Sequence, residues 1–99
     1  MDDPRPFTPE ALARLRADFP ALTREVRPGV PLVYLDSTAS TLKPKPVIER
    51  LAEFYLHHYA NIHRGIHLLS EEATDAYERA RARVARYLHV DPDEVIFVR

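Results

Sequence analysis

The last segment of the chain reads Glu94-Val95-Ile96-Phe97-Val98. Four consecutive apolar residues would give an extended segment two apolar faces, which is typical of a strand inside a parallel sheet. A sheet of only two strands could not cover such a strand and would leave its own edges open. The pattern therefore predicts that this chain is the opening part of a larger α/β protein and is incomplete as given.

The first third of the chain predicts a short helix followed by a strand. Thr8-Pro9-Glu10 combines a hydroxyl cap, a proline in the first turn and an acid near the positive end of the helix dipole, which predicts a helix over residues 9–18. After the break at Pro28-Gly29, the compact apolar run over residues 32–35 predicts a strand.

Two longer helices are predicted between this strand and the last one. Pro44 and Pro46 introduce a periodic segment over residues 47–59 whose wide apolar face predicts good coverage. Ser70 is predicted to cap a second helix that continues to residue 88. The order is thus short helix, strand, two longer helices and strand.

Composition and charge limit the classes of protein to which this chain could belong. The chain has 99 residues, 45% of them hydrophobic and 29% charged, as expected for one small domain. Fourteen basic and fifteen acidic residues give a formal charge of −1, which provides no attraction to nucleic acid or to an anionic membrane. The sequence contains no bilayer-length apolar run and no signal peptide at its start. It predicts a cytoplasmic protein with no nucleic-acid or membrane partner.

Several kinds of site are excluded by residues that the sequence lacks. Without cysteine, the chain can hold neither a disulfide nor a thiolate metal site, and it offers no sulfur nucleophile. Two scattered glycines exclude a P-loop and a dinucleotide-binding fingerprint. Asp36 could act as a general base, but an acid at a strand end before a Ser/Thr run more commonly forms a turn.

Histidines are concentrated in one region, with four of the five between positions 57 and 67. His63 and His67 have the i, i+4 spacing of zinc ligands, but Gly65 lies between them and Arg64 follows His63 where a metalloprotease has glutamate. We therefore predict no metal site. Residues 61–67 fit better as a polar loop between helices. Its imidazole and guanidinium groups could either bind a ligand or have a structural role.

Taken together, several strings resemble the beginning of the class V aminotransferase family, and most closely its SUF-type cysteine desulfurases. The resemblance covers residues 19–99. The strings are Leu32-Val33-Tyr34-Leu35-Asp36-Ser37-Thr38-Ala39-Ser40, Lys43-Pro44, the run from Tyr59 through His63-Arg64-Gly65-Ile66-His67, and Glu94-Val95-Ile96-Phe97-Val98-Arg99.

The resemblance implies a homodimeric fold type I enzyme that uses pyridoxal 5′-phosphate. Such an enzyme converts L-cysteine to L-alanine and passes persulfide sulfur to an acceptor protein for iron–sulfur cluster assembly. Residues 1–46 would form a lead-in and strand of the small domain, and residues 47–99 would begin the large, cofactor-binding domain.

By the same resemblance, Thr38 and Ala39 would lie near the substrate, while His63 and Arg64 would line the active-site entrance. Thr38 stands where the family commonly has alanine, which leaves the fine substrate preference open. The resemblance places no catalytic, cofactor-binding or metal residue in this chain. The cofactor lysine and the cysteine nucleophile of such enzymes are absent, since Lys43 and Lys45 only flank a predicted helix start. The 99 residues alone are expected neither to turn over cysteine nor to bind the cofactor.

Two alternatives remain open at this point. The parent could be another enzyme of the same fold, such as a selenocysteine lyase, an epimerase or a kynureninase-like enzyme. The chain could also be a small, non-enzymatic helical interaction module. The module would unfold cooperatively on its own, whereas an exposed apolar strand would make the isolated chain prone to aggregate.

Overall fold

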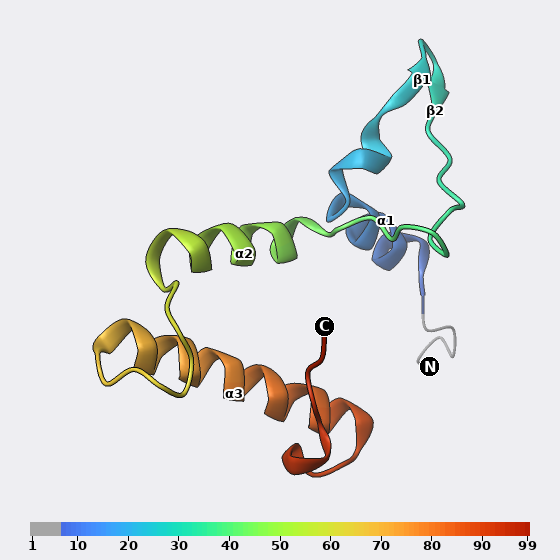
Figure 1. Ribbon diagram of the computed structural model, residues 1–99. Helices are drawn as coiled ribbons and strands as arrows, with labels where there is room; N and C mark the ends of the chain where they lie inside the picture. Colours follow the sequence, from blue (N-terminus) through green and yellow to red (C-terminus); the bar gives the residue numbers. More distant parts are fainter. Residues whose placement is uncertain (1–6) are drawn as a thin grey trace. The chain divides into compact units, whose positions relative to one another are not determined.

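The computed structural model describes residues 7–99 and divides the chain into two compact units, Met1–Ala52 and Glu53–Arg99 (Figure 1). The predicted absence of a signal peptide concerns the first residues and lies outside the described ones. Among residues 7–99, no helix is both long enough and apolar enough to cross a membrane.

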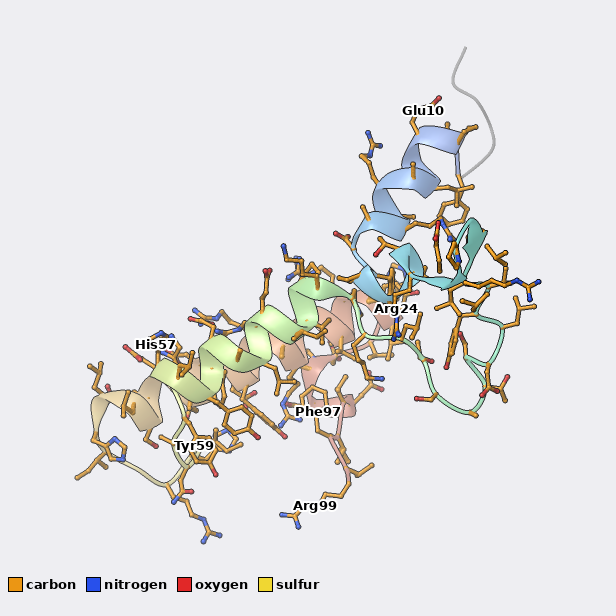
Figure 2. The ribbon with its side chains drawn as sticks, turned by 90° about the horizontal axis from the view of Figure 1, so that it is seen from above. Glu10, Arg24, His57, Tyr59, Phe97 and Arg99 are labelled. Atoms are coloured by element: carbon orange, nitrogen blue, oxygen red, sulfur yellow. The ribbon has the colours of Figure 1, made fainter. Side chains whose placement is uncertain are left out.

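The first unit begins with the predicted short helix. Helix α1 spans Pro9–Ala17, and the Thr8 hydroxyl accepts a hydrogen bond from the Ala11 N–H at 3.2 Å. Figure 2 shows Glu10 in the first turn, at the positive end of the helix dipole. The cap and the helix are both confirmed. A 3-10 helix, η1, follows over Pro20–Thr23.

A small antiparallel hairpin comes next, formed by β1 (Glu25–Arg27) and β2 (Val30–Pro31). Gly29 lies in its turn with φ of 77°, a left-handed conformation that glycine adopts without steric cost. The Gly29 N–H also donates to the Glu25 carboxylate at 3.1 Å. The break predicted at Pro28-Gly29 is therefore the turn of a hairpin.

The strand predicted over residues 32–35 does not form in this chain. The Leu32 N–H donates to the Arg24 carbonyl at 2.9 Å, which extends the hairpin pairing by one residue. Residues 33–36 then belong to no helix or strand within the described part of the chain, and Val33 and Leu35 are exposed. The apolar run has the side chains of a strand but lacks a neighbouring strand to bond to.

A turn over residues 37–39 precedes α2 (Lys45–His57). The Asp36 carbonyl accepts hydrogen bonds from the N–H groups of Ala39 and Ser40, at 3.2 and 3.1 Å. Asp36 thus begins a turn through its backbone carbonyl. The predicted coverage of the following helix is wrong for the described chain, because α2 contains no buried residue.

The second unit is organised around α3 (Leu68–Leu88). This helix begins before the predicted cap. His67 is the cap, and its Nδ1 accepts a hydrogen bond from the Ser70 N–H at 3.3 Å. Ser70 instead lies inside the helix, where it is fully buried. His89 ends the helix in the left-handed conformation, with φ of 58°.

The end of the chain folds back onto α3 through a second 3-10 helix, η2 (Pro92–Glu94). The buried residues of this unit are Ser70, Ala73, Ala85 and Val95.

The strand predicted over residues 94–98 does not form in the described part of the chain, because Glu94 belongs to η2 and residues 95–98 have no paired strand. Its side chains nevertheless alternate in exposure, since Val95 is 8% and Phe97 41% exposed while Ile96 and Val98 are 77% and 85% exposed. Figure 2 shows Phe97 beside the ribbon and Arg99 projecting away from it. One face of the segment is therefore packed on α3, and the other is uncovered.

Candidate functional site

The loop over residues 59–67 is held in place by the buried hydroxyl of Ser70. The Ser70 Oγ donates to the Asn61 carbonyl at 2.5 Å and accepts from the Gly65 N–H at 3.1 Å. One side chain on the first turn of α3 thus fixes two points of the loop backbone. Because Ser70 is completely buried, solvent cannot compete directly for its hydroxyl.

Gly65 is needed here because of the closeness of Ser70. A Cβ added to Gly65 would overlap the Cβ and Oγ of Ser70 and would come within 3.1 Å of the His67 ring. The requirement is for space and not for an unusual φ, since only Gly29 among the two glycines has a positive φ. The glycine lets the loop approach the helix closely.

His63, a predicted substrate-binding residue, is fixed at both its backbone and its side chain. Its φ is 62°, and its N–H donates to the Thr74 hydroxyl at 2.9 Å. Its Nε2 lies 2.7 Å from Oε1 of Glu78, and its ring packs edge-on against Tyr77 with the centroids 5.5 Å apart. The imidazole is only half-buried, so it remains open to a ligand.

Arg64, the next predicted site residue, is exposed and has no hydrogen bond or ion pair to any residue in the described chain. An exposed guanidinium offers planar, charged donors that match a carboxylate or a phosphate. The loop therefore presents two groups with different roles, a positioned imidazole and a guanidinium that has no partner among the described residues.

Glu78 connects His63 to the end of the chain. Its second carboxylate oxygen, Oε2, accepts from Nε of Arg81 at 3.0 Å. The hydrogen bond from His63 is the main cause that lowers the pKa of the Glu78 carboxyl, with Arg81 adding to it. Arg81 also donates to the Val95 carbonyl and lies over the rings of Tyr77 and Phe97 at 5.3 and 5.6 Å.

His58 lies just after α2 and makes a contact separate from those of His63. Its Nδ1 lies 2.9 Å from Glu72 of α3, and its Nε2 lies 2.8 Å from Glu53. Only the protonated ring carries an N–H on both nitrogens, so the two carboxylates favour that form. The hydrogen bond to Glu72, followed by that to Glu53, raises the pKa of His58. This residue therefore has a structural role, in an ion pair with two carboxylates.

Thr38 and Ala39 lie in the first unit, in the exposed turn over residues 37–39. They and the pair His63 and Arg64 thus belong to different units. A cavity of about 350 Å³ in the first unit is bordered by residues on both sides of this turn. It is mainly apolar and is lined by Arg16, Phe19, Leu22, Leu32, Val33, Tyr34, Leu35, Ser37, Thr41 and Leu42.

The residues present do not fit pyridoxal 5′-phosphate. The sequence has two lysines, neither of which lines the cavity. Lys43 donates to the Thr41 carbonyl at 2.9 Å, and Lys45 pairs with Glu49 at 3.5 Å on the surface of α2. Neither is placed to form a Schiff base in an enclosed site. Within residues 7–99, the histidines and carboxylates also form no group of three or more that could hold a metal ion.

A sequence model of the family described as Aminotransferase class-V matches residues 33–99, which is more than half of the chain. The chain belongs to this family. Residues 63–67 and 94–99, which carry the resemblance, both lie within the matched region.

Relatives within the class-V aminotransferase family give a finer comparison. The chain is 54% identical over 90 residues to a cysteine desulfurase of Cronobacter sakazakii, covering 90% of this chain and 22% of that protein. It is 55% identical over 89 residues to a cysteine desulfurase of Pectobacterium carotovorum, covering 89% and 22%. The chain therefore spans about a fifth of the length of the curated relatives it matches.

A solved structure supports the fold. The apo structure of a cysteine desulfurase from Thermococcus onnurineus NA1 matches with a TM-score of 0.74 and 38% identity, over 85% of this chain and 19% of that one. The predicted fold class is confirmed, since this architecture is that of the amino-terminal part of a fold type I enzyme of the pyridoxal phosphate-dependent class.

Sequence reasoning missed the roles of four residues that shape the candidate site. Their spacing in the sequence could have identified them, because Ser70, Thr74, Glu78 and Arg81 follow one another at intervals of four, four and three residues and so lie along one face of α3. This polar stripe, Ser70/Thr74/Glu78/Arg81, contacts the loop and the chain end through the bonds described above. A continuous polar row on a partly buried helix face indicates a second polar segment packed against it.

Proposed function

We propose that this chain is the amino-terminal part of a pyridoxal phosphate-dependent cysteine desulfurase, which converts L-cysteine to L-alanine. The observation that carries the proposal is the loop over residues 59–67, in a family member whose curated relatives bear that name. The loop is rigidly bonded to α3, and it offers a positioned imidazole beside an unpaired guanidinium.

The finer parts of the proposal concern the longer protein. It is a homodimer of the SUF type that passes persulfide sulfur to an acceptor protein for iron–sulfur cluster assembly, and it works in the cytoplasm. Residues 1–46 belong to its small domain and residues 47–99 begin its large domain. The longer protein supplies the cofactor site, the Schiff-base lysine and the cysteine nucleophile, because the described residues do not fit that role.

Within this scheme, the chain's own residues bind and orient the substrate. Arg64 pairs with the substrate carboxylate, for which its exposed guanidinium has the matching geometry. His63 offers its unbonded ring nitrogen to a polar group of the substrate. Thr38 and Ala39 contribute an exposed turn whose small side chains allow close approach. The Thr38 hydroxyl adds a hydrogen-bonding group where the family commonly has alanine.

The test is to express the full-length protein that contains residues 1–99 and to measure alanine and sulfide formed from L-cysteine, together with the visible absorbance of bound cofactor. We expect activity and absorbance from the full-length protein and neither from the 99-residue chain. Absence of both from a folded full-length protein would show the proposal to be wrong. Turnover of L-selenocysteine in clear preference to L-cysteine would identify a selenocysteine lyase instead.

A further inference from the structure

The side chain of His63 has its own bonding partner, separate from the bonds that hold its loop. The loop backbone is fixed by the Ser70 hydroxyl and by the bond from the His63 N–H to Thr74. The contact between Nε2 of His63 and Glu78 is therefore not needed to hold the loop against the helix. What this contact determines is the orientation of the imidazole ring.

Glu78 is itself held rigidly. One of its oxygens lies 2.7 Å from His63 and the other 3.0 Å from Nε of Arg81. Arg81 is anchored in turn by the Val95 carbonyl and by the rings of Tyr77 and Phe97. Because both oxygens are bonded, the carboxylate cannot rotate without losing a charged hydrogen bond. It is consequently a fixed acceptor for an imidazole N–H.

A carboxylate accepts hydrogen bonds and cannot donate them, so Nε2 must be the nitrogen that carries the hydrogen. In the neutral ring this leaves the lone pair on Nδ1. Nδ1 of His63 makes no hydrogen bond to the described residues. The packing of the ring edge-on against Tyr77 at 5.5 Å restricts its remaining rotation.

We propose that Glu78 is a positioning residue for substrate binding: its carboxylate holds the Nε2–H of His63 and thereby presents Nδ1 as an acceptor to a donor group of the amino-acid substrate. This inference rests on the proposed function and assigns a role to a residue outside the predicted site. Glu78 acts through His63 and does not touch the substrate.

The test compares variants of the full-length protein by steady-state kinetics with L-cysteine. Glu78→Ala should raise KM about 10-fold and change kcat less than about twofold, because an imidazole free to rotate binds the substrate in fewer of its orientations. Glu78→Asp keeps the charge beside Arg81 but withdraws it from His63, and it should raise KM about fivefold. The matched control is Glu72→Ala, which removes a histidine–glutamate contact elsewhere on the same helix. It should change KM less than about twofold.

A double-mutant cycle separates positioning from a general effect on folding. In a His63→Ala background, Glu78→Ala should have almost no further effect on KM, because the group through which it acts is already gone. An equal loss of about 10-fold in both backgrounds would overturn the inference, as would an unchanged KM in Glu78→Ala or in Glu78→Asp. If Glu78→Ala fails to fold, Glu78→Asp in the same two backgrounds decides the question. A folded wild-type protein that forms no alanine would instead overturn the proposed function and the inference with it.

Discussion

Replacing Ser70 with alanine should weaken the second unit although it removes only one atom. The Ser70 hydroxyl makes two bonds to the loop backbone, to the Asn61 carbonyl and from the Gly65 N–H. Each such bond contributes about 1 kcal/mol net, so losing both costs about 2 kcal/mol. Alanine favours the interior of a helix over serine by about 0.5 kcal/mol, which offsets part of this loss. The expected decrease in the free energy of unfolding is therefore about 1.5 kcal/mol.

The measurement is urea unfolding of wild-type and variant protein, followed by circular dichroism. Ser40→Ala is the matched control, because Ser40 is exposed and only its backbone takes part in the bonds of the described chain. It should change the free energy by less than about 0.5 kcal/mol. If Ser70→Ala were no more destabilising than Ser40→Ala, the argument that this hydroxyl holds the loop would be wrong.

Three further predictions concern the second unit. Gly65→Ala should lower the free energy of unfolding by about 1 to 3 kcal/mol in the same urea assay, because the new Cβ overlaps Ser70; an unchanged midpoint would show that the loop has room for it. Val95→Ala should cost about 1.5 kcal/mol while Val98→Ala costs less than about 0.5, since the first valine is buried and the second exposed; equal costs would contradict the packing of the chain end on α3. The contact of His58 with two glutamates should stabilise the protein fully below the unfolded pKa of about 6.5, and this contribution should disappear as pH rises through the raised pKa of the folded state. Melting temperatures of wild type and His58→Gln between pH 5 and 9 should thus converge at high pH, and a constant difference would refute the assignment.

Local signals in the sequence predicted where the helices lie, but they did not predict which of their side chains are buried. Thr8 and the following proline and glutamate specify the start of α1 through groups only three residues apart, so the helix was predictable. The cap of α3 was misplaced because serine is a preferred capping residue and histidine is not, whereas in the structure His67 is the cap and Ser70 is buried inside the helix. A pattern of residue types cannot show which of two hydrogen-bonding side chains faces the interior.

The two predicted strands illustrate a different limit. Residues 32–35 and 94–98 were predicted as strands from their apolar composition, but a strand also needs a partner that supplies hydrogen bonds along its length. Composition indicates the preference of a segment, while pairing depends on residues far away in the chain. In the candidate site, the resemblance identified His63 and Arg64. The spacing along α3 marks Glu78 as part of a polar stripe, but its contact with His63, fifteen positions away, is seen only in the structure.

The ring of Tyr77 lies between two others, that of His63 at 5.5 Å and that of Phe97 at 5.2 Å. The loop over residues 59–67 and the end of the chain therefore both contact α3 at its middle turn. The end turns of a helix are the first to fray, and a central turn is the last. Fraying of the last turn of α3, over residues 86–88, would therefore leave the contacts of Tyr77 with His63 and Phe97 in place. Amide hydrogen exchange should be slowest near Tyr77.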